Sequence, residues 1–127
     1  MKTKVILTLC VVFVLTLATS ADAQLVAGSA EEKAFTRIEG EQNSDAKIQL
    51  LLEFEKTYPQ SRVLPDIYTM LMTIYQGRNE TAKVVDFGER AIKIDGENLN
   101  ALLAVSRNLA LERKQIDKAI SYAQKAV

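Results

Sequence analysis

From residue 30 onward, the apolar residues of this chain recur at intervals of three and four, and clusters of turn-forming residues interrupt them at regular distances. No stretch of this region alternates between apolar and polar residues with period two. Apolar residues spaced three and four apart form one face of an α-helix, whereas a half-buried strand needs strict alternation. The pattern therefore predicts an all-α fold.

The turn-forming residues divide this region into six expected helices, at about 30–42, 45–57, 65–76, 80–95, 99–112 and 115–126. Ser29 with Glu32 three residues later matches a capping box, and Asn98 suits the N-cap of the fifth helix. Pro59 ends the second helix, and Gly96 suits a left-handed cap after the fourth. Because the connections are short, successive helices are expected to pair as antiparallel hairpins.

Gly88 lies inside the expected fourth helix. A glycine there costs about 1 kcal/mol of helix stability relative to Ala. The sequence therefore predicts a packing reason for Gly88, namely a neighbouring helix that approaches too closely for a side chain.

The first 23 residues have the features of a secretory signal peptide. Lys2 and Lys4 precede an apolar run over residues 5–18, and Ala21-Asp22-Ala23 matches a signal-peptidase site. We expect cleavage after residue 23, an exported protein that is periplasmic or secreted, and a flexible lead-in over residues 24–29. The alternative is a retained membrane anchor, but the 14-residue run is shorter than the ~20 residues that span a bilayer. No membrane insertion is expected after cleavage.

Composition narrows the chemistry available to the remaining 104 of 127 residues. The chain has no His, and its one Cys, Cys10, lies in the expected signal peptide. A mature protein without His or Cys has no typical zinc site, no thiol nucleophile and no disulfide. The formal charge of zero and the pI near 6.3 give no basic footprint for nucleic acid. We therefore expect no catalytic residue, no metal and no cofactor.

Carboxylates are plentiful, but they fall on expected solvent faces, where Lys and Arg separate them. Paired acids serve as acid and base only where burial separates their pKa values. A small helical enzyme remains the alternative, and it would require a cluster of buried polar groups in a cleft. The carboxylates considered are Glu31, Glu32, Glu53, Glu55, Asp86 and Glu89.

Two segments repeat one pattern of residue types. Residues 86–92 and 121–127 both read polar, aromatic, small, polar, basic, Ala, aliphatic, with a shift of 35 residues. Upstream, three residues match at a shift of 34, namely Tyr68, Leu71 and Tyr75 with Leu102, Val105 and Leu109. The one-residue difference fits into the turn at residues 112–114. A helix–turn–helix unit with this period indicates an internal repeat rather than an ordinary helical bundle.

A 34-residue helical hairpin is the period of the tetratricopeptide repeat, and this chain resembles that family. Tyr68, Leu71 and Tyr75 stand where the family has Trp, Leu and Tyr, and Ala91 stands at the small position of the second helix. The resemblance implies three hairpins over residues 30–127, at about 30–64, 65–98 and 99–127. It further implies that they stack as a short α-solenoid with a right-handed superhelical twist.

Three residues depart from the family pattern. Met72 stands where Gly or Ala is expected, and Val84 and Gly88 stand where Ala and an aromatic residue are usual. These exchanges predict an altered contact between helices rather than another fold. The first unit ends in Tyr58-Pro59-Gln60-Ser61, which resembles a junction common in exported bacterial tetratricopeptide proteins of cell-envelope assembly.

The resemblance also implies a binding groove, because the first helices of successive hairpins line the concave side of such a solenoid. The lining is polar with one apolar and one basic member, which suits an extended peptide or a partner helix. It lacks the Lys, Asn and Arg set with which chaperone-binding relatives hold a C-terminal carboxylate. The candidate groove residues are Asp66, Thr69, Thr73, Gln76, Asn100, Leu103 and Arg107.

A second candidate surface lies on the last expected helix, whose apolar residues have no following helix to cover them. Solenoids need a polar outer face on the terminal unit. We therefore expect self-association or a partner at this end, with Ile116, Ala119, Ile120 and Ala123 as the candidate contacts. Together these features predict a non-enzymatic scaffold or adaptor that binds another protein or peptide, with a signal-anchored membrane protein as an alternative.

Overall fold

The computed structural model describes residues 25–127, so the expected signal peptide lies outside the described residues. Within them the chain forms six α-helices and no strand, which confirms the all-α prediction. The expected helix ranges agree with the observed ones to within two residues at each end. The helices are α1 (Ala30–Gly40), α2 (Ser44–Thr57), α3 (Leu64–Gly77), α4 (Thr81–Ile94), α5 (Leu99–Leu111) and α6 (Ile116–Lys125).

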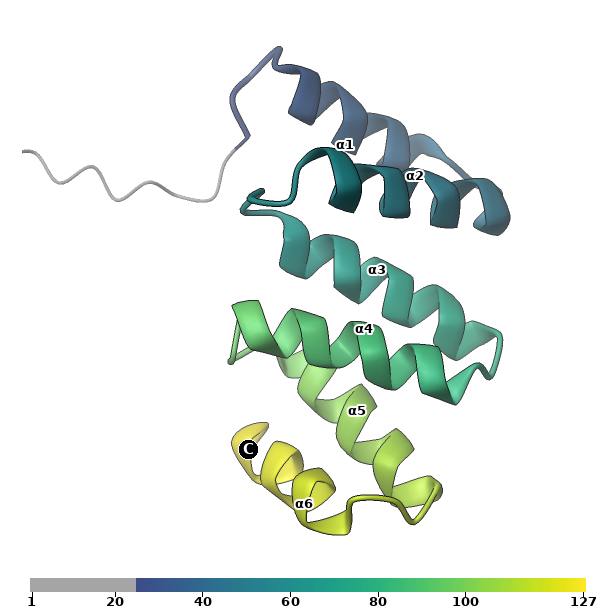
Figure 1. Cartoon of the computed structure of the whole chain (residues 1–127), viewed down its shortest axis with the longest axis vertical. Helices are drawn as coiled ribbons and strands as arrows, with labels where there is room; N and C mark the ends of the chain where they lie inside the picture. The colour runs from purple at the N-terminus through teal and green to yellow at the C-terminus, as the bar shows by residue number, and fades with distance from the viewer. Residues whose placement is uncertain (1–24) are drawn as a thin grey trace, which may run out of the picture.

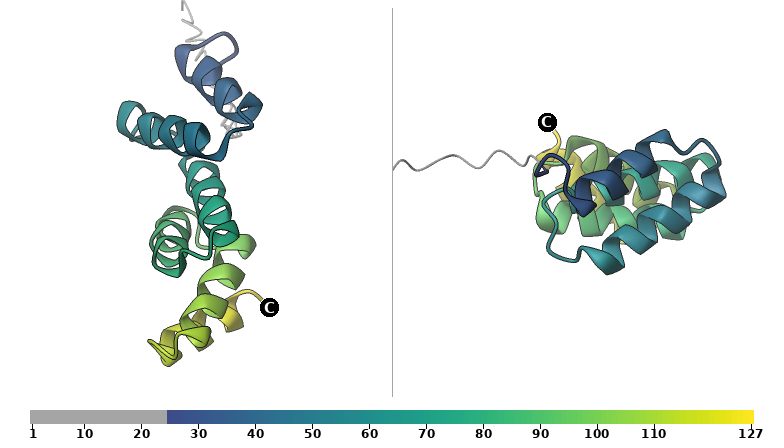
Figure 2. Two further views of the ribbon diagram at one scale, coloured as in Figure 1. Left: turned by 90° about the vertical axis from the view of Figure 1, so that its right-hand side faces the viewer. Right: turned by 90° about the horizontal axis from the view of Figure 1, so that it is seen from above.

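The helices follow one another along the long axis of the molecule, each packed against the next (Figure 1). α3 pairs with α4 and α5 pairs with α6, and α5 also packs against α4. Seen from the side, α1, α3 and α5 lie along one side of the stack and α2 and α4 along the other (left view of Figure 2). This arrangement is that of a helical repeat, in which each hairpin contacts only its neighbours.

Side-chain caps fix where several helices begin. The Ser29 hydroxyl accepts a bond from the backbone N–H of Glu32 at 3.1 Å, which is half of the expected capping box. The Glu32 carboxylate accepts from the N–H of Gly28 instead of Ser29. The Asn43 and Asn98 side chains accept bonds from the first turns of α2 and α5, so these helix starts follow directly from sequence.

The turns explain the two different repeat shifts. Three residues, 78–80, join α3 to α4, whereas four residues, 112–115, join α5 to α6. The extra residue therefore lies where the sequence predicts it. Asn79, Arg113 and Gln115 adopt positive φ in these turns, and Gly96 does not. The prediction of a left-handed cap at Gly96 is wrong, since α4 ends with Asp95 in an extended conformation.

The core runs through the stack as one large cluster and a smaller one. The large cluster includes buried residues of α1 to α5, with Phe54 edge-on to Phe35 at a centroid distance of 6.2 Å. The smaller one joins α5 to α6 through Val105, Leu109 and Ala119. The apolar stripes of the sequence thus form a continuous interior.

Gly88 lies at a close contact between α4 and α5. A Cβ atom placed on Gly88 would lie 2.3 Å from Cγ2 of Val105 and 3.1 Å from the sulfur of Met72. The close-approach prediction is therefore confirmed. The two departures from the family pattern at Met72 and Gly88 are complementary, because the long Met72 side chain lies beside Gly88, which has no side chain.

Candidate binding surfaces

A hollow of ≈ 350 Å³ lies between α3 and α5. It brings together five of the seven residues that the sequence predicts for a groove. Met72 and Ala104, which are not among the predicted groove residues, complete its lining. Met72 and Ala104 are buried, and the other lining residues are exposed and polar except for Leu103. The five predicted residues are Thr73, Gln76, Asn100, Leu103 and Arg107.

The other two predicted groove residues do not line this hollow. Thr69 is half-buried, and its hydroxyl donates to the Pro65 carbonyl at 2.8 Å and accepts from the Asn98 amide at 3.1 Å. This contact ties the start of α5 to α3, so Thr69 helps to set the spacing of the groove walls. Asp66 is exposed in the first turn of α3.

Arg107 is the residue on which the candidate surfaces converge. It lines the hollow between α3 and α5, a neighbouring one of ≈ 260 Å³ near the ends of these helices, and one of ≈ 310 Å³ between α5 and α6. Within residues 25–127 its guanidinium group has no ion-pair or hydrogen-bond partner. An exposed Arg with all its donors free suits an incoming carboxylate.

The hollow between α5 and α6, here called the end groove, contains the four candidate end-face residues. Ile116 and Ile120 are 44% and 50% exposed, Ala123 is exposed, and Ala119 is buried at 4% against α5. Ser106, Arg107 and Ala110 of α5 form the opposite wall. The lining is apolar except for Ser106 and Arg107.

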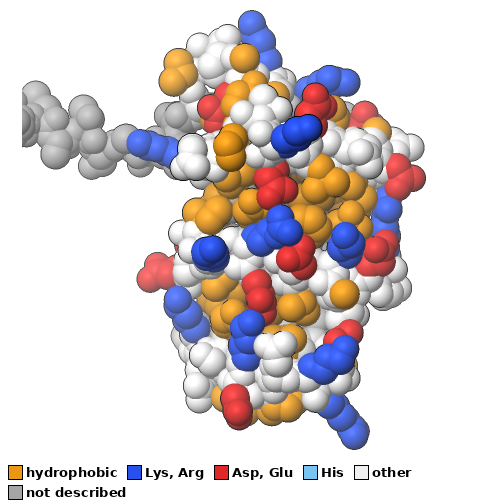
Figure 3. Space-filling view, viewed as in Figure 1, with side chains coloured by type: hydrophobic (Ala, Val, Ile, Leu, Met, Phe, Trp, Pro, Cys, Tyr) orange, Lys and Arg blue, Asp and Glu red, His pale blue; other side chains and the backbone are white. Residues whose placement is uncertain are grey.

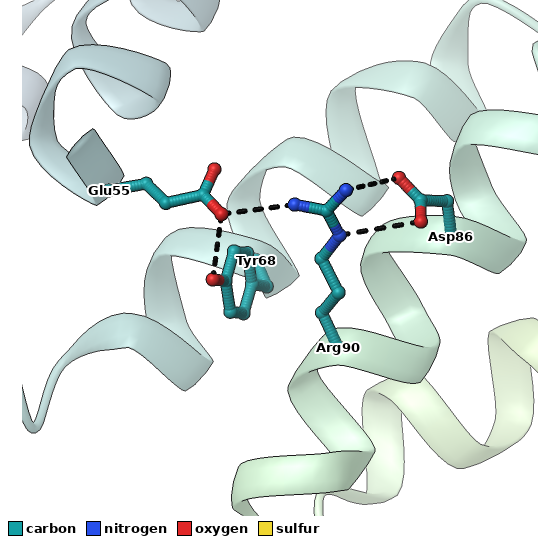
Figure 4. Close-up of polar contacts among 4 residues, drawn as sticks. All are labelled: Glu55, Tyr68, Asp86 and Arg90. Atoms are coloured by element: carbon teal, nitrogen blue, oxygen red, sulfur yellow. Dashed lines mark hydrogen bonds and ion pairs between the residues drawn. The ribbon is translucent and has the colours of Figure 1, made fainter. Parts of the chain in front are cut away.

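A polar network on another face joins the first hairpin to the second (Figure 4). The Glu55 carboxylate of α2 accepts from the Tyr68 hydroxyl at 2.9 Å and from Arg90 Nη1 at 3.0 Å. Arg90 also pairs with Asp86 at 3.1 Å and lies 5.1 Å from the ring centroid of Phe87. Glu55 is therefore partly buried in an ion pair, which corrects the expectation of a solvated face.

This network holds neighbouring hairpins in register. Its charged members are partly exposed, so each pair contributes at most about 1 kcal/mol, and the geometry matters more than the energy. On the face shown in Figure 3, hydrophobic side chains gather over α2 and α3 with acidic and basic side chains among them. Of this network, sequence spacing along α4 predicts only the Asp86–Arg90 pair, because the contacts of Glu55 depend on how the hairpins stack.

Burial raises the pKa of the Tyr68 phenol, and the hydrogen bond to Glu55 raises it further. The stability gained by keeping this phenol protonated is complete below about pH 10 and is lost as the pH rises through the raised pKa. We expect the unfolding free energy to fall less between about pH 8 and about pH 10.5 in Tyr68→Phe than in the unaltered protein. Urea titrations at both pH values measure this, with Tyr58→Phe as control. An equal fall in Tyr68→Phe would contradict it.

The described residues contain no cluster of three or more His, Cys, Asp or Glu side chains placed to hold a metal ion. Among residues 25–127, each helix is too short or too polar to span a bilayer. Comparison with protein-family models, with curated proteins and with solved structures found no match to this chain.

Proposed function

We propose that this protein is a non-enzymatic binding module of the tetratricopeptide type, which holds an extended peptide segment of another protein in the hollow between α3 and α5. The observation that carries the proposal is the convergence of Thr73, Gln76, Asn100, Leu103 and Arg107 on that one hollow. These residues come from the first helices of successive hairpins, which is where the resemblance places a ligand surface.

The chemistry of the hollow supports a peptide rather than a small molecule. The amide groups of Gln76 and Asn100 can donate to and accept from a peptide backbone, and the Thr73 hydroxyl, which donates to the Thr69 carbonyl, can accept a hydrogen bond from one. Leu103, which is 50% exposed, offers an apolar contact, and the free Arg107 offers a site for an acidic side chain. A shallow mixed surface of this kind suits an extended segment.

The proposal is tested by selecting ligands from a phage-displayed random peptide library on the purified protein. Recovered peptides are expected to carry Asp or Glu near an apolar residue. Leu103→Lys and Arg107→Glu should each weaken their binding about tenfold or more, measured by fluorescence anisotropy.

Ile94→Lys is the matched control, because Ile94 is 53% exposed on α4 and does not line the hollow. It should leave the affinity within about twofold, since surface changes outside an interface have little effect. Equal losses in Leu103→Lys and Ile94→Lys would show that the hollow is not the binding surface.

We further propose that the module is exported, on the signal-peptide pattern of residues 1–23. N-terminal sequencing of the protein isolated from cells that express the whole chain should begin at Gln24. A mature protein that still begins at Met1 or Lys2 would contradict this and would favour the anchored alternative.

A further inference from the structure

Exposed large hydrophobic residues are concentrated in the last hairpin. Six of the eight in the described part of the chain lie at or after residue 99: Leu99, Leu103, Leu111, Ile116, Ile120 and Val127. Single exposed apolar residues are ordinary, but exposed apolar residues that share one hollow indicate a contact surface. Ile116 and Ile120 belong to the end groove.

The internal repeat shows what fills such a groove. Shifts of 34 residues on α5 and 35 on α6 give each of the seven end-groove residues a counterpart on α3 or α4. Ser106 and Arg107 correspond to Met72 and Thr73, for example, and Ala123 corresponds to Gly88.

All seven counterparts face α5. Met72, Thr73 and Gln76 share the hollow between α3 and α5 with residues of α5, and Thr81 and Val84 share the neighbouring hollow with α5. Val85 packs in the cluster that contains Val105 and Leu109. Gly88 lies against the side chain of Val105 on α5. In the second hairpin, these positions on α3 and α4 therefore form a groove in which a helix, α5, packs. The end-groove residues occupy the equivalent positions on α5 and α6.

We propose that the end groove is a docking site for one amphipathic helix of a partner protein, seated as α5 is seated on α3 and α4. On α5, Ala104 lines the hollow beside Met72, Val105 lies against Gly88, and Ala101 packs in the same buried cluster as Met72; all three are small or medium in size and buried. The partner helix therefore presents small or medium apolar residues at intervals of three and four.

Charge specifies the partner further. Thr73, the counterpart of Arg107, shares its hollow with Asn100 and Leu103 of the docked helix. On a bound partner helix, the residue equivalent to Leu103 would therefore face Arg107, which is the one charged residue of the end groove. The partner helix carries a carboxylate there. A second copy of this chain presents no such acid on α5, where the corresponding residues are Asn and Leu.

The test uses capped synthetic peptides that copy residues 97–113, one with Leu103→Glu and one with Leu103→Lys, titrated against the purified protein by calorimetry. The Glu peptide should bind about tenfold tighter than the Lys peptide. In the Arg107→Glu protein this preference should reverse. Ile120→Glu should abolish binding of both peptides. Because Ile120 is half-exposed, this variant is expected to fold, and circular dichroism checks that it does.

Three results would overturn the proposal: equal binding of both peptides, unchanged binding to the Ile120→Glu protein, or self-association that Ile120→Glu abolishes, measured by sedimentation. The last would make a second copy the occupant of the end groove. Ile120 does not line the hollow between α3 and α5, whereas Leu103 does. If the end groove binds no helix, the proposal that the hollow between α3 and α5 binds a peptide is unaffected. If that hollow binds no peptide, the end-groove proposal is likewise unaffected.

Discussion

Replacing Phe87 with Ala is expected to lower the free energy of unfolding by about 3–5 kcal/mol. Phe87 is 4% exposed and lies between two tyrosine rings, 5.6 Å from Tyr75 and 6.3 Å from Tyr68 between centroids. Truncation removes the apolar contact area and both ring contacts, and it leaves a cavity between α3 and α4. Urea unfolding followed by circular dichroism measures the loss.

The repeat provides the matched control for Phe87. Tyr122 occupies the corresponding position on α6, where it is only half-buried because no described helix covers that side. Tyr122→Ala should therefore cost less, about 1–2 kcal/mol. Equal losses at the two positions would mean that the last hairpin is as fully covered as the middle one, contrary to the structure.

Gly88→Ala is expected to destabilise the protein by about 1–3 kcal/mol, the usual cost of overpacking a close contact. Inside a helix the same substitution ordinarily stabilises by about 1 kcal/mol, so the sign of the change is itself informative. The reason is the 2.3 Å separation between the added Cβ and Cγ2 of Val105, which forces α4 and α5 apart. Thermal or urea unfolding gives the sign directly.

Two comparisons isolate this contact. Gly77→Ala adds a methyl group at the end of α3, where no atom lies within 4 Å, and should be neutral or slightly stabilising. In the presence of Val105→Ala, the penalty for Gly88→Ala should largely disappear, which a double-mutant cycle reports as a coupling of about 1–3 kcal/mol. A stabilising Gly88→Ala in the unaltered background would refute the close approach of α4 and α5.

The helices were predictable because their signals are local. Apolar spacing, the caps Ser29 and Asn98, and the stop at Pro59 each act within a few residues, and all agree with the structure. The turns were less predictable. Arg113 and Gln115 adopt positive φ, which their residue types do not favour and therefore do not predict.

The candidate surfaces were predictable in part, since they depend on how helices stack. The resemblance to tetratricopeptide repeats implied a groove that includes Thr73, Gln76, Asn100, Leu103 and Arg107, and these five residues share one hollow. Thr69 does not line this hollow, and its hydroxyl accepts from the Asn98 amide, a contact that spacing along one helix does not reveal because the two residues are 29 positions apart. The bond between Glu55 and Tyr68 was missed for a similar reason, since it joins separate hairpins.

Binding in the hollow between α3 and α5 is tested most directly by amide chemical-shift mapping of the ¹⁵N-labelled protein with a peptide from the library selection. The largest shifts are expected at Thr73, Gln76, Asn100, Leu103 and Arg107, with α1 and the outer face of α4 unchanged. Shifts that cluster on α1 and α2, or on the face of the Glu55–Arg90 network, would contradict a binding module built on this hollow.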